Sequence, residues 1–225
     1  MAINAAEEET VESLKQWWAE NGKQLIILVV VGFAAFTSWL VWTNSQNANL
    51  DSASDMYEEI LALAVTDAGQ PGTLLIPQDS ERIIELGAQL RSEHSGSTYA
   101  KLGSLFAAQQ SVRSDDLDAA ETSLQWILDN EQGGLLSEAD EGLLLTTNLR
   151  LGRIILAKGD AERALALVNN IAPKTFEAGY SELRGDIYTV MGRDVDARDA
   201  YIAAQEAGSS SDGLRMKLDE LSNES

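Results

Sequence analysis

A long segment without charge limits most strongly what this chain can fold into. Residues 24–50 contain no charged side chain, and the 18 residues of 25–42 are apolar except for Gly32, Thr37 and Ser38. As an α-helix, 18 residues extend about 27 Å, close to the thickness of a bilayer's hydrocarbon core. We therefore predict a transmembrane helix over 24–43. A cleaved secretory signal is the first alternative, although its apolar region usually covers about 7–15 residues. A buried helix of a soluble domain is the second.

Basic residues near this segment predict its orientation. Lys15 and Lys23 precede the segment, whereas the first basic residue after it is Arg82. Because Lys and Arg near a membrane helix favour the cytoplasmic side, we expect residues 1–23 in the cytoplasm and the larger C-terminal part across the membrane. In a bacterium this is a single-pass inner-membrane protein with a periplasmic domain.

Small and aromatic residues suggest further contacts near the membrane. Gly32, Ala35 and Ser38 share one side of the predicted span, and small residues allow membrane helices to pack closely. We expect them to contact a channel subunit or a partner's anchor. Trp17 and Trp18 belong to a short amphipathic stretch that we expect on membrane lipid, with packing against a partner as the alternative.

Beyond a linker over 44–51, residues 52–225 show the apolar spacing of helices rather than strands. A first helix begins at Asp51 or Ser52 and ends in DAGQPG, and its partner runs from about Asp79 to SEHSGS. Three further hairpins follow in the same way. Their first helices cover about 98–112, 142–157 and 178–191, and their second helices lie in DDLDAAETSLQWILDN, GDAERALALVNNI and RDVDARDAYIAAQEAG.

The hairpins resemble one another at glycine and alanine positions. Three pairs of residues are each 33 positions apart, close to the tetratricopeptide (TPR) period of 34. They are Gly152 and Gly185, Gly159 and Gly192, and Ala164 and Ala197, with Ala120 in the equivalent place one hairpin earlier. We expect Ala120, Gly152, Ala164, Gly185 and Ala197 to allow close helix packing. The pattern predicts an all-α, TPR-like helical-hairpin solenoid behind the membrane helix, and an ordinary helical bundle is the alternative.

Composition argues against several functions. The formal charge is −20, which disfavours nucleic acid as a partner. There is no Cys and one histidine, His94, so thiol chemistry and the usual zinc motifs are excluded. His94 lies in a polar turn, where we expect it to face solvent. We predict no enzymatic role, no metal and no cofactor. A hydrolase with paired acids is a rival hypothesis, but no motif supports it.

A concave groove formed by the first helices is the predicted binding surface. Its candidate residues are Gln109, Arg113, Leu149, Arg153, Glu182 and Asp186. Plain exposure to solvent, without a binding role, is the alternative for this set. They lack the Lys and Asn arrangement of TPR proteins that clamp a peptide carboxylate, so we expect an extended or apolar peptide segment, or a folded partner. The part beyond the span carries 14 basic and 31 acidic residues, which favours basic partners. Trp126 is expected in the core.

The chain also resembles a known family. The block VESLKQWWAENGK at Val11 to Lys23, directly before the span, and the later strings DSASDMYEEIL and TYAKLGSLFAAQQSV resemble the YfgM family of proteobacterial inner-membrane TPR proteins. The resemblance implies an ancillary subunit of the SecYEG translocon that pairs with the periplasmic chaperone PpiD, binds emerging secretory clients and performs no chemistry. An insertion over 130–142 and a longer loop over 69–78 depart from the family. The alternative is an anchored scaffold for envelope assembly or cell division.

Overall fold

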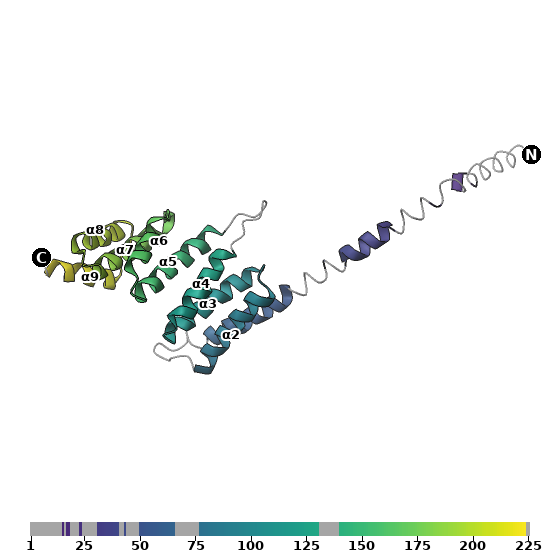
Figure 1. Ribbon diagram of the computed structural model, residues 1–225, viewed down its shortest axis with the longest axis horizontal. Helices are drawn as coiled ribbons and strands as arrows, with labels where there is room; N and C mark the ends of the chain where they lie inside the picture. Colours follow the sequence, from purple (N-terminus) through teal and green to yellow (C-terminus); the bar gives the residue numbers. More distant parts are fainter. Residues whose placement is uncertain are drawn as a thin grey trace, which may run out of the picture. The chain divides into compact units, whose positions relative to one another are not determined.

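The computed structural model consists of two compact units, Met1–Ser52 and Ala53–Ser225 (Figure 1), which we describe separately. It describes residues 15, 17, 18, 23, 31–40, 43, 50–65, 77–130 and 140–223. All regular elements among these residues are helices, as the sequence predicts.

In the first unit, residues 31–40 are helical. The Thr37 hydroxyl donates to the carbonyls of Phe33 and Ala34, at 2.9 and 3.0 Å. Within the described residues, no helix is both long and apolar enough to span a membrane. The predicted span over 24–43 is described only in part, because residues 24–30, 41 and 42 lie outside the described residues.

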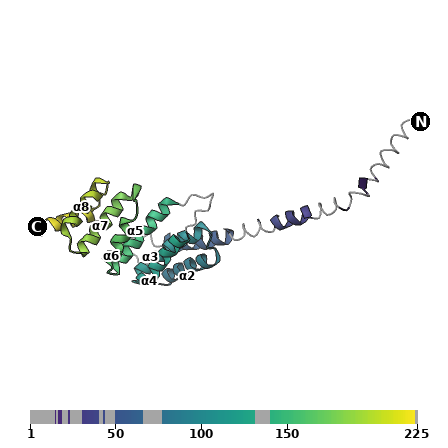
Figure 2. The same cartoon turned by 45° about the horizontal axis from the view of Figure 1, so that its top comes forward.

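The second unit is a row of antiparallel helices that pack in chain order (Figures 1 and 2). Residues 50–65 are helical, and the labelled elements that follow are α2 (Pro77–Glu93), α3 (Thr98–Arg113), α4 (Leu117–Asp129), α5 (Glu141–Ala157), α6 (Ala161–Asn169), η1 (Lys174–Phe176), α7 (Glu177–Val190), α8 (Asp194–Glu206) and α9 (Asp212–Asn223). Each labelled α-helix from α2 to α8 contacts the next one along the chain, and α5 also contacts α7. This is the stacking of a helical-hairpin solenoid.

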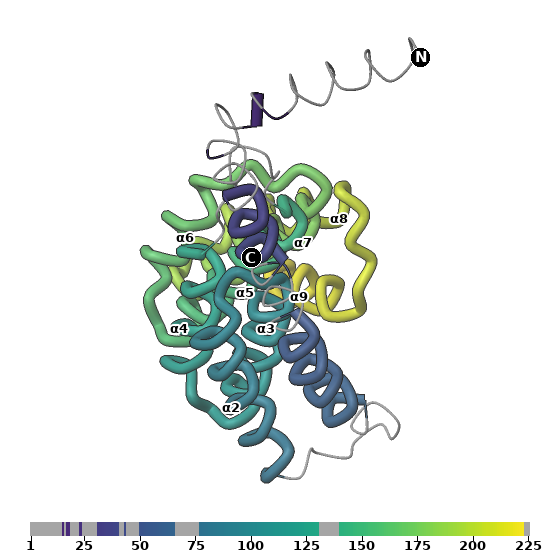
Figure 3. Tube along the Cα trace, turned by 90° about the vertical axis from the view of Figure 1, so that its right-hand side faces the viewer, coloured from purple at the N-terminus to yellow at the C-terminus, as the bar shows by residue number. Residues whose placement is uncertain are grey.

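The second helices α2, α4 and α6 lie along one edge of the view in Figure 3, with the first helices α3 and α5 toward the middle. Buried apolar residues form separate clusters along the row rather than one central core. The largest involves α3 to α7, another lies around α2 and α3, and a third joins α8 to α9. Such a division is expected where each hairpin touches only its neighbours.

The turns between paired helices share one backbone geometry. Gly159, Gly192 and Gly208 have φ values of 88°, 68° and 102°, and Asp115 takes the same role with φ 61°. In each turn the residue after this position donates its N–H back into the preceding helix, for example from Asp116 to the Ser111 carbonyl at 2.8 Å. This closing bond is the usual end of a helix whose next residue is left-handed.

Two predicted helix starts are wrong. Leu50 and Asp51 are already helical, so neither Asp51 nor Ser52 caps the first helix, and the predicted linker is shorter at this end. No Gly or Pro interrupts the preceding polar residues, which gives the helix no reason to begin at Asp51. Likewise α2 begins at Pro77 rather than near Asp79, because proline fits the first helical position well.

Two elements were not predicted at all, η1 and α9. The signal for α9 is present in the sequence, since Leu214, Leu218 and Leu221 recur at helical spacing. The Ser211 hydroxyl accepts the Leu214 N–H at 3.1 Å, which caps the helix start. Leu214 and Leu221 are buried against α8, so α9 covers the apolar end of the last hairpin.

Candidate binding pocket between α3 and α5

The small residues of the repeat lie where helices come closest. Ala120, Ala164 and Ala197 are fully buried. A Cβ atom built on Gly152 would be 2.8 Å from Cδ2 of Leu183, and one on Gly185 would be 2.2 Å from the Tyr201 ring. These distances are shorter than ordinary carbon contacts, so no larger residue fits at either glycine without movement.

The first helices α5 and α7 pack directly against each other. The Tyr180 hydroxyl of α7 donates to the Leu145 carbonyl of α5 at 2.9 Å, and burial raises the pKa of Tyr180 to about 12. Leu149 of α5 lies against Gly179 of α7, where an added Cβ would be 3.0 Å from the leucine methyl group. Little surface is therefore left open between α5 and α7.

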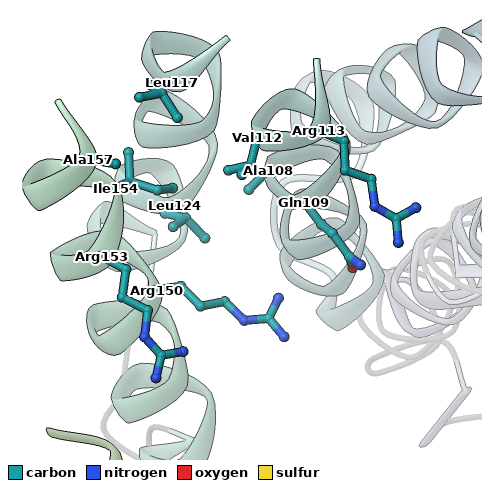
Figure 4. A pocket seen from close by; sticks show the side chains of 10 residues that line it. All are labelled: Ala108, Gln109, Val112, Arg113, Leu117, Leu124, Arg150, Arg153, Ile154 and Ala157. Carbon is teal, nitrogen blue, oxygen red and sulfur yellow. The ribbon is translucent and has the colours of Figure 1, made fainter. Parts of the chain in front are cut away.

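The step between α3 and α5 is different, because a pocket of about 600 Å³ separates these helices (Figure 4). Its apolar floor comes from Leu124 of α4, Ala108 of α3 and Ile154 of α5, all buried. The remaining lining residues are Gln109, Val112, Arg113, Leu117, Arg150, Arg153 and Ala157. Arg150 reaches from α5 into the space toward α3 in Figure 4.

The pocket lining is positively charged, although the chain is strongly acidic. Its charged side chains are Arg113, Arg150 and Arg153, and it includes no Asp or Glu. Neither Arg150 nor Arg153 forms an ion pair with another described residue. Thus the overall charge, which favours basic partners, gives the wrong sign for this part of the surface.

A second depression, of about 450 Å³, lies over α4 and contains Asp118, Glu121, Asp129 and Lys158 among its lining residues. Here carboxylates outnumber the one lysine of the lining. Glu121 accepts from Arg163 of α6 and from Lys158 at the end of α5, and these hydrogen bonds hold the pKa of Glu121 below its ordinary value. The cluster joins three helices and leaves no excess of basic groups.

The six predicted groove residues separate into two groups. Gln109, Arg113 and Arg153 line the pocket. Leu149 is only 9% exposed and belongs to the core, so its assignment to the groove surface is wrong. The helical register explains the error: Leu149 precedes the exposed Arg150, and its side chain turns toward α7 rather than toward the groove.

Glu182 and Asp186 contact α9 instead of an open groove. Lys217 of α9 donates to Glu182 at 3.1 Å and to Asp186 at 2.6 Å. Burial disfavours the charged form of Lys217, but the hydrogen bonds and attraction to the two carboxylates outweigh it and raise the pKa of Lys217. Asp186 also accepts from the Tyr201 hydroxyl at 2.8 Å. Both carboxylates thus have partners inside the chain. The sequence prediction placed them in the groove because it did not include α9, which supplies Lys217.

Seven of the ten lining residues were not predicted, among them the exposed Val112 and Arg150. A signal was available for Arg150, because it lies three positions before Arg153 and therefore near it on the helix surface. Val112 is 44% exposed next to the pocket. The prediction sampled one position per helical turn and passed over both.

Two other predictions concern His94 and Trp126. His94 is half-buried rather than facing solvent, and its Nε2 atom is enclosed without a hydrogen-bond partner among the described residues. The described part of the chain contains no cluster of His, Asp and Glu suited to a metal ion. Trp126 is half-buried and packs against two of the core clusters.

Comparison with known proteins gives the family. The model of a family described as "Tetratricopeptide repeat-like domain" matches residues 15–223. An Escherichia coli (strain K12) protein is 31% identical over 99% of this chain and 100% of its own length, and a Haemophilus influenzae protein is 29% identical over 98% and 100%. Both relatives are named "Ancillary SecYEG translocon subunit". The chain belongs to the YfgM family.

A more distant YfgM relative from Neisseria gonorrhoeae, with the same name, is 25% identical over 98% of this chain and 100% of its own length. The similarity to these YfgM proteins therefore includes both the N-terminal unit and the helical hairpins. No solved structure matches the chain.

Proposed function

We propose that this YfgM-family chain is an inner-membrane protein of the SecYEG translocon whose periplasmic TPR-like domain binds other polypeptides. The pocket between α3 and α5 carries the proposal, since it gives the solenoid an open, partly apolar surface on its first helices. The names of the relatives supply the translocon as the place of action. The proposed partners are a PpiD-like chaperone and emerging secretory chains, and the proposed role is binding without chemistry.

The exposed apolar residues of the first unit support a membrane anchor over 24–43. Val31, Phe33, Phe36, Trp39 and Leu40 are each 53–68% exposed, which is costly in water but favourable in lipid. The hydroxyl of Thr37 is satisfied by its own helix, as lipid requires. With Lys15 and Lys23 before the anchor, we propose a cytoplasmic N-terminus.

Anchoring explains how a shallow pocket is sufficient. A domain tethered beside the channel shares a small volume with the chains that leave it, so the effective concentration of both is high. Weak binding then occupies the pocket often, and fast release lets the client continue. Tight intrinsic affinity is unnecessary.

Photocrosslinking from the pocket tests this function. A benzoylphenylalanine residue replaces Val112 beside the pocket, and the matched control replaces Val190, which occupies a similar place near the end of α7 and is also exposed. In native membranes we expect adducts with translocon subunits, a periplasmic chaperone or unfolded secretory chains from position 112 and few from 190. Equal capture from both positions, or capture only of proteins unrelated to secretion, would contradict the proposal.

A further inference from the structure

We infer that the pocket between α3 and α5 binds a short peptide segment in which an acidic side chain lies next to a large apolar one. This inference rests on the proposed function, because it specifies which polypeptide segments the TPR-like domain accepts. It assigns the apolar side chain to the floor formed by Ala108, Leu124 and Ile154, and the carboxylate to Arg150 and Arg153.

The charge distribution selects an acidic ligand. The part of the chain beyond the predicted span contains 31 acidic and 14 basic residues, yet the pocket is lined by three arginines and no carboxylate. An acidic segment is thus repelled by most of the domain and attracted at the pocket. A basic segment is repelled here and attracted elsewhere.

The positions of Arg150 and Arg153 suit a carboxylate within a peptide. Both arginines lie on the exposed side of α5, three positions apart, and neither has an acidic partner among the described residues. Arginine can bind a carboxylate through two parallel hydrogen bonds, which adds geometric specificity to the charge attraction. Other described arginines near carboxylates, such as Arg82 with Glu59 and Glu85, are already paired.

The size of the pocket favours a few side chains over a lipid surface. A volume of about 600 Å³ is in the usual range for concave sites that hold a small ligand. Side chains of α3, α4 and α5 form the apolar floor, against which an extended peptide would place one apolar side chain (Figure 4). A membrane would instead require a broad apolar face.

Fluorescence anisotropy with the full-length chain in detergent micelles tests the inference. The probe is a short labelled peptide, amidated at its carboxyl end, in which Glu alternates with Leu and Phe. We expect saturable binding that weakens with salt, because exposed charge pairs are screened. Two comparison peptides replace every Glu by Gln or by Lys, and a third carries Gln but has a free terminal carboxylate.

Matched variants locate the binding. Arg150→Glu with Arg153→Glu should weaken the peptide roughly tenfold, since each exposed pair contributes a factor of about 1.4 to 5 and reversal adds repulsion. The control is Arg198→Glu on α8, an exposed arginine that also forms no ion pair with a described residue. Val112→Ser should weaken binding and Val190→Ser should not. Circular dichroism checks that each variant is folded.

Several results would overturn the inference. Equal affinity for the Gln peptide, tighter binding of the Lys peptide, or equal effects of Arg198→Glu would exclude the acidic segment. Binding of only the free-carboxylate peptide would assign the arginines to a chain terminus. If anionic phospholipid mixed into the micelles competes with the peptide, and this competition is lost in the double variant, the pocket binds lipid. If the labelled acidic peptide does not bind while position 112 still crosslinks to translocon-associated proteins, the inferred ligand chemistry is wrong and the proposed function stands.

Discussion

At the scale of single residues, the solenoid depends on positions where a side chain is either absent or strained. Of the four helix ends described above as closed by a left-handed residue, three use glycine, and the α3–α4 turn uses Asp115; Lys174 also has a positive φ but lies in η1. A residue other than glycine is disfavoured at positive φ because its Cβ crowds the backbone, although Asp tolerates this better than most. Glycines inside helices serve a different purpose, which is close approach.

We expect Asp115→Gly to stabilise the chain by about 0.5–1 kcal/mol, because glycine adopts φ 61° without the steric cost. The reverse experiment is Gly159→Ala in the equivalent α5–α6 turn, with φ 88°, which should destabilise by about 1 kcal/mol. Urea unfolding followed by circular dichroism measures both. A stabilising Gly159→Ala would contradict the shared turn geometry.

Gly185→Ala should be the most damaging glycine substitution in the repeat. The new methyl group would lie 2.2 Å from the Tyr201 ring, and this ring cannot move freely because its hydroxyl donates to Asp186. We expect a loss on the order of 1–3 kcal/mol, the usual cost of overpacking. Gly96→Ala is the control, since nothing lies within 4 Å of its added Cβ. Similar melting temperatures for the two variants would contradict the close approach of α7 and α8.

At the scale of elements, charged side chains join helices at the surface of the row. Lys217 connects α9 to Glu182 and Asp186 of α7, and Glu121 connects α4 to the end of α5 and to α6. Such clusters fix how one hairpin meets the next, while burial of leucine and alanine supplies most of the free energy. Net stability from each exposed pair is small, so their pH dependence is the better test.

Glu121 should make the solenoid acid-sensitive. Its pKa is lower in the folded chain than in the unfolded one, because Arg163 and Lys158 donate hydrogen bonds to its carboxylate. The stabilisation is therefore complete above the ordinary glutamate pKa and disappears as the pH falls through the lowered value. Melting temperatures between pH 7 and pH 3 should drop less steeply for Glu121→Gln than for the wild type. Glu162→Gln, an exposed carboxylate without an ion pair among the described residues, should follow the wild-type curve.

At the scale of the whole molecule, the proposed membrane anchor would decide where the solenoid acts. Protease added to spheroplasts should digest residues 51–225, because Lys15 and Lys23 favour a cytoplasmic N-terminus and Arg82 is the first basic residue beyond the proposed anchor. If residues 51–225 resist the protease until the inner membrane is broken, the chain has the opposite orientation. Introducing two or three lysines over 44–49 should weaken the bias, which provides the positive control.

The anchor itself is expected to contact a partner through its small residues. Replacing 25–42 by an unrelated leucine-rich span of equal length should keep the chain in the membrane but abolish co-purification with a translocon subunit in mild detergent. Gly32→Leu alone should weaken this co-purification. Leu40→Ile, which exchanges an exposed residue for one of similar size, should leave it unchanged. Unchanged co-purification after the full replacement would place recognition in the TPR-like domain.

Much of this protein follows from sequence because the responsible interactions are local. Helical spacing, capping residues and turn glycines act within a few positions, so they predicted most of α2 to α8, and the equal offsets between Gly152 and Gly185 revealed the hairpin repeat. The family resemblance in Val11 to Lys23 was likewise readable. The failures at Asp51, Pro77 and α9 concern helix ends, where several starts have similar free energies.

Tertiary structure alone decided the pocket and its charge. Gln109 and Arg153 are 44 positions apart, and whether they border one cavity depends on how α3 and α5 pack, which no local pattern specifies. Packing of α5 on α7 buried Leu149 against Gly179, and the position of α9 paired Asp186 with Lys217. Net charge is a sum over the chain, whereas binding responds to the charges that folding brings together, so an acidic sequence could produce a basic pocket.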